Sequence, residues 1–358
     1  MENLYKLAIA PGVFAFLVAF LSSPLVIKLA KKIQVIDDPS KNRHPKVIHT
    51  YPVPRGGGLA CFIAIFLVSL TFLPIDKYLV GILSGGFFIT LIGLLDDKYN
   101  INPYLRLLFL FFVAIIPVAS GIGIAFLRNP FNGTLDLSQP QIKFFFLGQE
   151  RSIWILSDLF AIFWIIFLMN ILNMGAKGID GQLPGVVSIS SAVITILSLH
   201  YSADITQWPV IILAAITTGA YFGFLPWNIY PQKIMPGYSG STLAGYLLAI
   251  LSILSTTKVG TLLVVLGIPI ADTGYTILRR IVSGKSPVWG DAGHLHHKLL
   301  KAGLTKRQIS FLYWLATAIL GIIALNLNAE NKFYTIVGVV VFVGGLLLWL
   351  TYSSKPSK

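Results

Sequence analysis

Long apolar runs separated by short polar segments dominate this chain. Most runs are about 20 residues long, which is the length that an α-helix needs to cross the hydrocarbon core of a bilayer. The runs follow one another closely, so we expect one all-α membrane domain over residues 1–358 and no separate soluble domain. The pattern predicts about eleven membrane-spanning helices, in the ranges 7–30, 57–74, 78–95, 104–127, 153–172, 185–201, 208–226, 242–256, 259–282, 310–328 and 334–352.

The composition supports a membrane protein. Hydrophobic residues make up 55% of the chain, charged residues only 11%, and the mean hydropathy is +0.78. The first apolar run resembles a secretion signal, but Lys28, Lys31 and Lys32 follow it where a cleavage site would lie, so we predict a retained helix. Cys61 is the only cysteine, so no disulfide can form within the chain.

The 27 Lys and Arg residues are distributed unequally between alternate loops. The positive-inside rule places most of them in the cytoplasm if the N-terminus is outside and the C-terminus is cytoplasmic. Topology alone then explains the net charge of +13, which gives little support to nucleic-acid binding. The predicted cytoplasmic loops are about 31–56, 96–103, 173–184, 227–241 and 283–309.

One outward connection is long, at about residues 128–152. Within it, residues 134–137 and 142–146 have the composition of short strands, and they flank the turn-forming segment 138–141. We therefore predict a small β-hairpin on the outer surface.

Polar clusters occupy the predicted cytoplasmic loops, which indicates a site open to that side. The first loop carries Lys46, His49 and Arg55 just before three glycines, and these cations and amides could hold an anionic group. A basic loop that rests on anionic lipid is an equal alternative. Next, Asp96 and Asp97 end an otherwise apolar helix. Adjacent carboxylates repel each other and oppose the helix dipole there, which favours a catalytic pair over a merely hydrated helix end.

Two further clusters contain glycine beside polar side chains. Asn173 ends one predicted helix, and the glycine-rich segment after it carries Lys177 and Asp180, where backbone groups can approach a ligand closely. Residues 237–242 precede another helix, so their amides and hydroxyls are suited to phosphate, although the serines could equally be plain helix caps.

The last loop contains half of the six histidines of the chain. His294, His296 and His297 follow Asp291, and they come after Asp272 and Arg280 in the preceding apolar segment. Imidazoles suit the handling of phosphate, metal ions or protons, and lipid tails give no reason to keep them.

In order and spacing, the five clusters resemble the motifs of the polyprenyl-phosphate N-acetylaminosugar-1-phosphate transferases, which are integral membrane enzymes. The resemblance extends from Asp38 to about Leu304. It rests on residues 46–49 and 54–57, Asp96-Asp97, Asn173 with Asp180-Gly181, Gly237-x-Ser239-Gly240-Ser241, and Asp272, Arg280, Asp291 and His294-x-His296-His297. The last motif resembles the branch that acts on UDP-N-acetylhexosamines more than the muramoyl-pentapeptide branch, whose members carry three consecutive histidines.

The resemblance implies transfer of an N-acetylhexosamine-1-phosphate from a UDP-sugar to undecaprenyl phosphate, with release of UMP, at the cytoplasmic membrane. It implies Mg²⁺ as cofactor and the bilayer and both substrates as partners, and it leaves a homodimer open. The implied catalytic residues are Asp96, Asp97, Asp180, His294, His296 and His297, and the implied metal ligands are Asp96, Asp97 and Asp180. The implied substrate-binding residues are Lys46, His49, Arg55, Asn173, Lys177, Gly237, Tyr238, Ser239, Ser241, Arg280 and Asp291.

Two positions depart from the family pattern. Tyr238 stands where the family has a metal-binding Asp, and Lys177 stands in place of the first Asp of Asn-x-x-Asp-Gly, with one residue inserted. A lysine beside the site would repel magnesium, so one hypothesis is that Lys177 partly substitutes for the metal. The alternative is that Lys177 faces solvent and magnesium still binds through the remaining aspartates.

Two other functions stay open on the residues alone. A transporter or flippase would also have many helices, but it should carry polar groups near the span centres and on both sides of the membrane. A catalytically altered relative that only binds sugar nucleotide would explain Lys177 and Tyr238, although the retained aspartates and histidines favour an enzyme.

Overall fold

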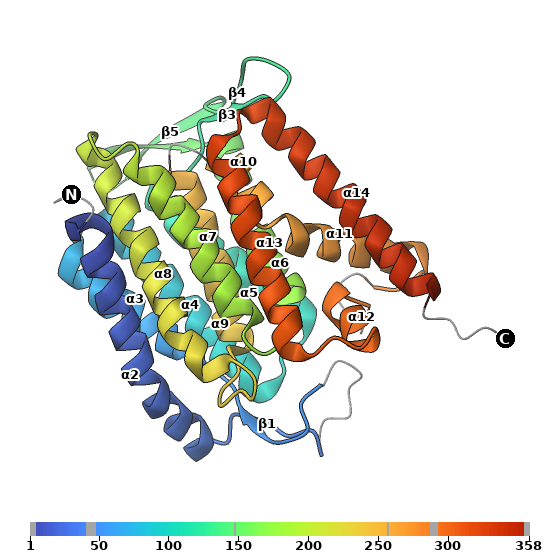
Figure 1. The fold of residues 1–358 in the computed structure, drawn as a ribbon. Coiled ribbons are helices and arrows are strands. Elements are labelled where there is room, and N and C mark those ends of the chain that lie inside the picture. The colour runs from blue at the N-terminus through green and yellow to red at the C-terminus, as the bar shows by residue number, and fades with distance from the viewer. Residues whose placement is uncertain (1–4, 41–47, 147, 256–257, 287–292, 354–358) are drawn as a thin grey trace.

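The computed structural model describes residues 5–40, 48–146, 148–255, 258–286 and 293–353. These residues form a mostly helical bundle with small antiparallel sheets at its two ends (Figure 1). After a π-helical turn at Tyr5–Ile9, the α-helices are α2 (Ala10–Lys32), α3 (Gly58–Phe72), α4 (Lys77–Tyr99), α5 (Pro103–Ala119), α6 (Ile155–Gly175), α7 (Gln182–Leu199), α8 (Trp208–Asn228), α9 (Gly237–Leu254), α10 (Lys258–Val265), α11 (Gly267–Val282), α12 (Leu295–Lys301), α13 (Lys306–Asn326) and α14 (Ala329–Ser353).

Each predicted apolar run coincides wholly or largely with a helix or with a bent pair of helices. In the described part of the chain, 8 helices are long and apolar enough to cross a membrane, and the bent pair α10–α11 makes up to 9. Helices α3 and α5 are apolar but shorter, with 15 and 17 residues. The protein is therefore a multi-pass helical membrane protein, and the figure of about eleven crossings, like the orientation of the termini, stays a prediction.

Helix α9 lies at the centre of the bundle. Almost all of its side chains are buried, and it packs against α4 and α6, whereas most of α14 is exposed. Small residues permit this close packing, since a Cβ atom added at Gly245 would lie 2.4 Å from the Leu168 carbonyl oxygen. Central α9 consequently carries the motif at its first residues deep into the protein.

Two predicted helix boundaries are wrong. The run 259–282 is not one straight helix, because α10 and α11 meet at an angle of 80°. Pro269 lies in the first turn of α11, where its missing N–H costs nothing, and this favours a new helix start there. The run 104–127 ends as a helix at Ala119, where Gly121 takes a positive φ of 103°.

The segment that was predicted to face outward contains hairpins, but the predicted pairing is wrong. Strand β3 (Phe126–Arg128) pairs with β4 (Thr134–Asp136), and β5 (Gln141–Phe146) pairs with β6 (Gln149–Trp154), so segments 134–137 and 142–146 do not pair with each other. The chain reverses at Asn132-Gly133 and at Gly148, whose φ angles are positive. Asn-Gly is a strong hairpin signal, and the sequence interpretation overlooked it.

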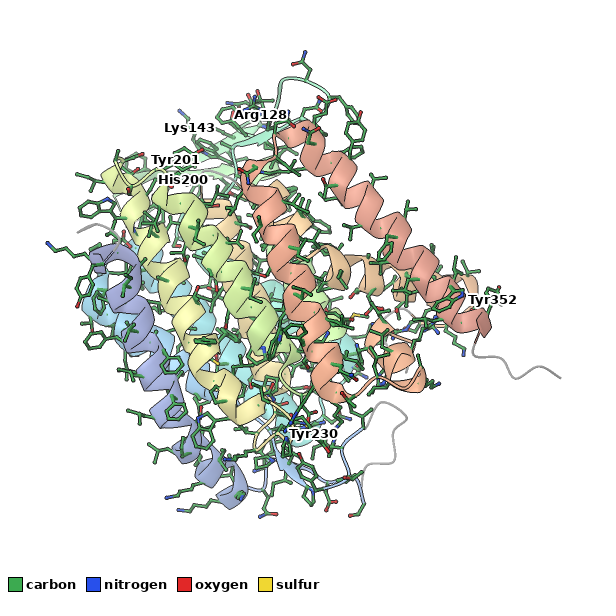
Figure 2. The ribbon with its side chains drawn as sticks, viewed as in Figure 1. Arg128, Lys143, His200, Tyr201, Tyr230 and Tyr352 are labelled. Carbon is green, nitrogen blue, oxygen red and sulfur yellow. The ribbon has the colours of Figure 1, made fainter. Side chains whose placement is uncertain are left out.

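The two ends of the bundle differ. Arg128, Lys143, His200 and Tyr201 lie at the hairpin end, while Tyr230 lies at the opposite end (Figure 2). That opposite end also holds the short pair β1 (Ile36–Asp37) and β2 (Val53–Pro54) (Figure 1). The two ends therefore separate the hairpins from the predicted cytoplasmic loops.

Candidate active site

A cavity of about 560 Å³ opens at the end opposite the hairpins, and all five polar clusters contribute to it. The expected site residues that line it are His49, Arg55, Asp96, Asp97, Asn173, Lys177, Asp180, Gly237, Tyr238, Arg280, His294, His296 and His297. Lys46 and Asp291 lie outside the described residues. Segments more than 200 residues apart in the sequence thus meet in one site.

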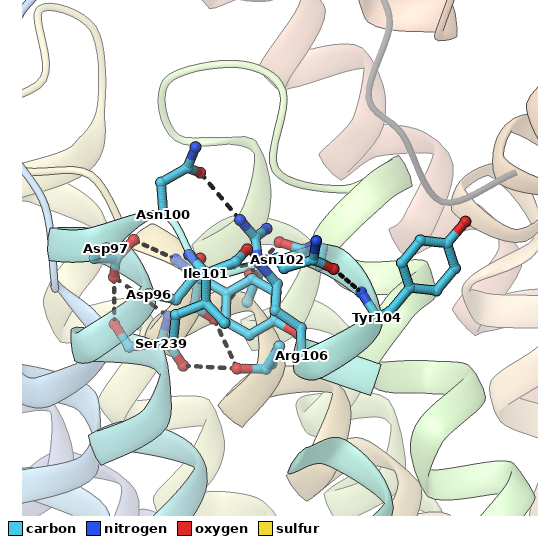
Figure 3. A network of polar contacts seen from close by, with 12 residues as sticks. Asp96, Asp97, Asn100, Ile101, Asn102, Tyr104, Arg106 and Ser239 are labelled. Atoms are coloured by element: carbon cyan, nitrogen blue, oxygen red, sulfur yellow. Dashed lines mark hydrogen bonds and ion pairs between the residues drawn. The ribbon is translucent and has the colours of Figure 1, made fainter. Parts of the chain in front are cut away.

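Asp96 joins the end of α4 to the start of α5 (Figure 3). Its Oδ1 atom lies 2.6 Å from Nε of Arg106 and accepts a hydrogen bond from the Ile101 amide at 3.0 Å. Arg106 also donates to the Ile101 carbonyl at 2.7 Å and to the Asn100 side chain at 3.0 Å. Arg106 was not expected as a site residue, because nothing in the local sequence marks it as the partner of Asp96.

Asp97 holds the beginning of α9. Its carboxylate accepts hydrogen bonds from the Tyr238 amide at 2.8 Å and from the Ser239 amide and hydroxyl at 3.4 and 3.0 Å. Gly237 has a φ of 71°, and a Cβ atom there would lie 2.1 Å from Oδ2 of Asp97, so glycine is required. The amides that were expected to bind phosphate already bind a carboxylate, which complements the positive end of the helix dipole.

Two expected substrate-binding residues lie behind the cavity wall. Ser239 and Ser241 are fully buried and do not line the cavity. Ser239 donates to Asp97, and the Ser241 hydroxyl donates to Oδ1 of Asn173 at 2.9 Å. The structure therefore gives these serines the position of supports for Asp97 and Asn173.

Asn173 also receives the Lys177 side chain. Nζ of Lys177 donates to Oδ1 of Asn173 at 2.5 Å, and it lies 5.7 Å from the centre of the Tyr238 ring. The Arg106 guanidinium lies 5.2 Å from the centre of the same ring. Lys177 thus belongs to the cavity wall, and it does not extend into solvent away from the site.

Asp180 lies in the loop between α6 and α7. Its Oδ1 atom accepts a hydrogen bond from Gln232 at 3.1 Å and lies 3.5 Å from Nζ of Lys306, whereas its buried Oδ2 atom has no hydrogen-bond partner. Burial raises the pKa of this carboxyl, and the charge of Lys306 opposes that shift. Gln232 and Lys306 were not anticipated, since both lie far from Asp180 in the sequence.

The three histidines lie beside this loop, with the His294 and His296 rings stacked and the His297 ring tilted by 47° to that of His296. Nδ1 of His294 lies 2.9 Å from Oδ2 of Asp272, whose other oxygen accepts the Leu295 amide at 2.8 Å. The His296 ring lies 5.6 Å from the His294 ring and 4.4 Å from the His297 ring, measured between centroids.

His296 is the most enclosed of the three. Burial, with His297 and His294 as neighbouring positive charges when they are protonated, holds the pKa of His296 well below its usual value. Its Nδ1 atom is buried without a hydrogen-bond partner. A Cβ atom at Gly178 would lie 1.9 Å from Nε2 of His296, so the ring rests directly on the Gly178 backbone.

The first loop completes the wall. Arg55 makes an ion pair of 2.5 Å with Asp37 across the β1–β2 pair, and His49 is buried beside it in the cavity lining. Asp37 therefore holds Arg55 in the cavity wall, where its charge also acts on Asp97.

The described side chains do not form a magnesium site by themselves. Among the described side chains, no group of three His, Cys, Asp or Glu residues could hold a metal ion. Asp97 accepts three hydrogen bonds, Asp96 pairs with Arg106, and of the three proposed ligands Asp180 alone keeps a buried oxygen without a partner. Magnesium takes about six oxygen ligands, and at phosphate sites water and substrate phosphates supply those that one or two carboxylates do not. The chemistry below is therefore derived from side chains, and the magnesium prediction stays untested.

Comparison with known proteins gives the family. A family model described as glycosyl transferase family 4 matches residues 79–256. The chain is 31% identical to the probable undecaprenyl-phosphate N-acetylglucosaminyl 1-phosphate transferase of Bacillus subtilis (strain 168), over 89% of this chain and 86% of that protein.

Two more distant relatives carry related names. The undecaprenyl-phosphate alpha-N-acetylglucosaminyl 1-phosphate transferase of Escherichia coli (strain K12) is 30% identical, over 86% of this chain and 80% of the relative. The phospho-N-acetylmuramoyl-pentapeptide-transferase of Caldanaerobacter subterraneus is 28% identical, over 85% and 93%. Because these similarities span almost the whole length of both chains, this protein belongs to the polyprenyl-phosphate sugar-1-phosphate transferases of glycosyl transferase family 4.

Proposed function

We propose that this transferase moves N-acetylglucosamine-1-phosphate, or a close N-acetylhexosamine analogue, from a UDP-sugar to undecaprenyl phosphate and releases UMP. The proposed location is the cytoplasmic face of the cell membrane, in the first membrane step of envelope polysaccharide synthesis. The names of the relatives support the acceptor and the sugar. One observation carries the proposal: a single cavity at one end of an apolar bundle gathers cations, carboxylates and neutral imidazole.

The reaction requires the lipid phosphate and the nucleotide to meet at the membrane surface. An unesterified oxygen of polyprenyl phosphate forms a bond to the sugar-bearing β-phosphorus. The bond from that phosphorus to the bridging oxygen breaks, and its electron pair leaves with UMP. Such transfers depend mainly on positioning and on the stabilisation of negative charge.

The described side chains divide these tasks. Arg55, Lys177 and Arg280 supply positive charge in the cavity wall for the phosphates. Asp97 fixes the beginning of α9, and with it Tyr238, against the end of α4. The cavity of about 560 Å³ falls within the usual range of about 300–1,000 Å³ for small-molecule sites, so it can accept the nucleotide-sugar head.

The polar atoms without partners support a proposed position for the sugar and the nucleoside. Oδ2 of Asp180 is a buried carboxyl oxygen that can accept a hydrogen bond from a ribose or sugar hydroxyl, and Nδ1 of the His296 imidazole, whose pKa is lowered, can accept or donate one. We assign Asp180 and His296 to the sugar nucleotide, and we assign Asp96 and Arg106, which line the same cavity, to the lipid phosphate.

A labelled-substrate assay tests the proposed reaction. Purified protein in lipid bilayers is incubated with undecaprenyl phosphate and UDP-N-acetylglucosamine labelled at the β-phosphate. We expect the label to move to the organic phase, with one UMP formed for each lipid product. UDP-N-acetylgalactosamine and UDP-N-acetylmuramoyl-pentapeptide serve as comparison donors, and we expect slower transfer from both.

The products separate the alternatives. Release of UDP in place of UMP would mean transfer of the sugar alone and would contradict the proposal. Tight binding of the UDP-sugar without any lipid product would instead support the catalytically altered relative. For orientation, a reporter that is active only in the cytoplasm should work at the C-terminus and fail when inserted near Pro140. The reverse pattern would place the cavity on the other side of the membrane.

A further inference from the structure

Two cations share one aromatic ring in the cavity wall. The Tyr238 side chain is buried, and its ring centre lies 5.2 Å from the Arg106 guanidinium and 5.7 Å from Nζ of Lys177. An aromatic face attracts cations, most strongly where water is excluded. Tyr238 therefore keeps both positive groups at the end of the cavity where Asp96 and Asp97 lie.

Lys177 is also positioned by hydrogen bonding. Its ammonium donates to Asn173 at 2.5 Å, and Ser241 fixes the same amide oxygen from α9. Lys177 interacts electrostatically with both Asp96 and Asp97. Contacts from α6 and α9 thus fix the Lys177 ammonium next to the carboxylate pair, although the lysine side chain itself is flexible.

This arrangement is unsuited to a divalent cation. The carboxylates nearest to Lys177 already accept hydrogen bonds or pair with Arg106, and the described residues provide no group of three metal ligands. Lys177 and Arg106 would repel a metal ion placed between them and the phosphates. An ammonium can instead bind a phosphate directly as a point charge.

Building on the function proposed above, we infer that Lys177 is a catalytic residue whose ammonium binds the diphosphate, so that transfer needs no divalent metal held by the protein. Negative charge develops on the oxygens of the β-phosphate and on the bridging oxygen as the bond to UMP breaks. Lys177 stabilises this charge while Tyr238 and Asn173 hold it in place. No proton has to move if the lipid phosphate attacks as a dianion.

Removal of metal is the first test. Initial rates of lipid product formation are measured with excess EDTA and with magnesium. We expect wild-type rates that agree within about threefold, because the ammonium stays in place when metal is removed. Transfer that requires magnesium would overturn the inference and leave the proposed function intact. Absence of transfer in both conditions would overturn the proposed function and the inference with it.

Substitution of Lys177 is the second test. Lys177→Met keeps the length of the side chain without its charge, and should lower kcat about 100-fold or more with or without magnesium. Lys177→Arg keeps the charge and should retain transfer in EDTA, which separates lost chemistry from lost folding. Lys233→Met is the matched control, because Lys233 lies 5.0 Å from the Trp227 ring but outside the cavity lining. A Lys177→Met enzyme with the wild-type rate would overturn the inference.

A charge exchange provides a readout independent of turnover. The double variant Lys177→Asp with Tyr238→Asp replaces the cation and the ring by carboxylates beside Asp96 and Asp97. Binding of Mn²⁺ to the purified proteins is followed by electron paramagnetic resonance. We expect one bound Mn²⁺ in the double variant and none in the wild type. Specific binding of Mn²⁺ by the wild-type protein alone, without nucleotide, would overturn the inference.

Discussion

The two walls of the cavity differ in whether their polar groups have hydrogen-bond partners within the protein. On the α4–α9 wall, Asp96 pairs with Arg106, and Asp97 accepts hydrogen bonds from Tyr238 and Ser239. On the opposite wall, formed by Gly178, Asp180 and the histidines, Oδ2 of Asp180 and Nδ1 of His296 are buried without partners. The first wall is satisfied within the protein, and the second is not.

This difference indicates separate tasks. A buried polar atom without a partner costs about 1–3 kcal/mol, and a charged one costs more. A site retains such atoms where a ligand supplies the missing hydrogen bonds. We therefore expect the α4–α9 wall to fix geometry and charge for the transfer, and the Asp180–His296 wall to recognise the sugar nucleotide. Substitutions on the first wall should lower kcat, and those on the second should mainly raise KM.

The largest effect should come from Asp97. Asp97→Asn keeps the size of the side chain but places an NH₂ group where an oxygen accepted the Tyr238 or Ser239 amide. Displacement of the α9 terminus should lower kcat about 100-fold or more, because small misplacements of reacting groups carry that cost. Initial rates at several concentrations of UDP-sugar should show little change in KM.

Asp158→Asn is the matched control for this substitution. Asp158 also accepts a backbone N–H, that of Trp154 at 3.1 Å, but at the hairpin end of α6. It should leave kcat within about threefold of wild type, since it lies far from the reacting groups. If Asp97→Asn raised KM and left kcat unchanged, the assignment of geometry to the α4–α9 wall would be wrong.

A somewhat smaller effect is expected at Asp180. A hydrogen bond to a charged acceptor contributes about 1.5–3 kcal/mol, which corresponds to about 10–100-fold in kcat/KM. Asp180→Asn should therefore raise KM for the UDP-sugar by about that factor, and equilibrium binding should weaken in parallel. The same loss confined to kcat would place Asp180 with the α4–α9 wall instead.

The sequence predicted the helical class, the positions of the apolar runs and the residues of the cavity more fully than it predicted their contacts. The polar clusters could be found because ionisable residues are costly in a membrane and therefore stand out. Arg106, Gln232 and Lys306 could not be found, because their partners lie on other elements: Asp96 is in α4, and Asp180 is in the loop between α6 and α7. The local sequence suggested a phosphate-binding role for the α9 amides, but Asp97, which lies 141 residues before Tyr238, already binds them.

The two helix boundaries and the hairpin pairing failed for local reasons. Hydrophobicity alone does not record a bend such as the one at Leu266, where both arms remain apolar. The hairpin was predicted at the wrong turn, because the segment around Pro140 also contains turn-forming residues. The chain instead reverses at Asn132-Gly133 and at Gly148, where φ is positive. Backbone conformation, more than composition, determined both outcomes.

Gly178 offers a milder change on the recognition wall. Gly178→Ala forces a methyl group against the His296 ring, which must shift because the added atom would lie 1.9 Å from Nε2. KM for the UDP-sugar should rise about tenfold, which corresponds to one displaced hydrogen bond of about 1.4 kcal/mol. Gly274→Ala is the control, since nothing lies within 4 Å of a Cβ atom there. Equal KM values in both variants would exclude contact between His296 and the nucleotide sugar.

The smallest effect should appear in the dependence of stability on pH. The folded protein keeps the pKa of His296 well below 6.5, mainly through burial and also through the neighbouring His297 and His294 rings. Between its lowered pKa and pH 6.5, the unfolded chain binds a proton that the folded protein does not bind. His296 therefore favours the folded state fully above pH 6.5, and this contribution is lost as the pH falls through that window.

The Tm of the detergent-solubilised protein should consequently fall from pH 8 to pH 5.5, and it should fall less in His296→Gln, which has no proton to gain. His200→Gln removes an exposed imidazole at the hairpin end, and should leave the wild-type slope unchanged. A His296→Gln protein with the full wild-type fall in Tm would show that His296 is hydrated, and would remove it from the enclosed wall on which the comparison rests.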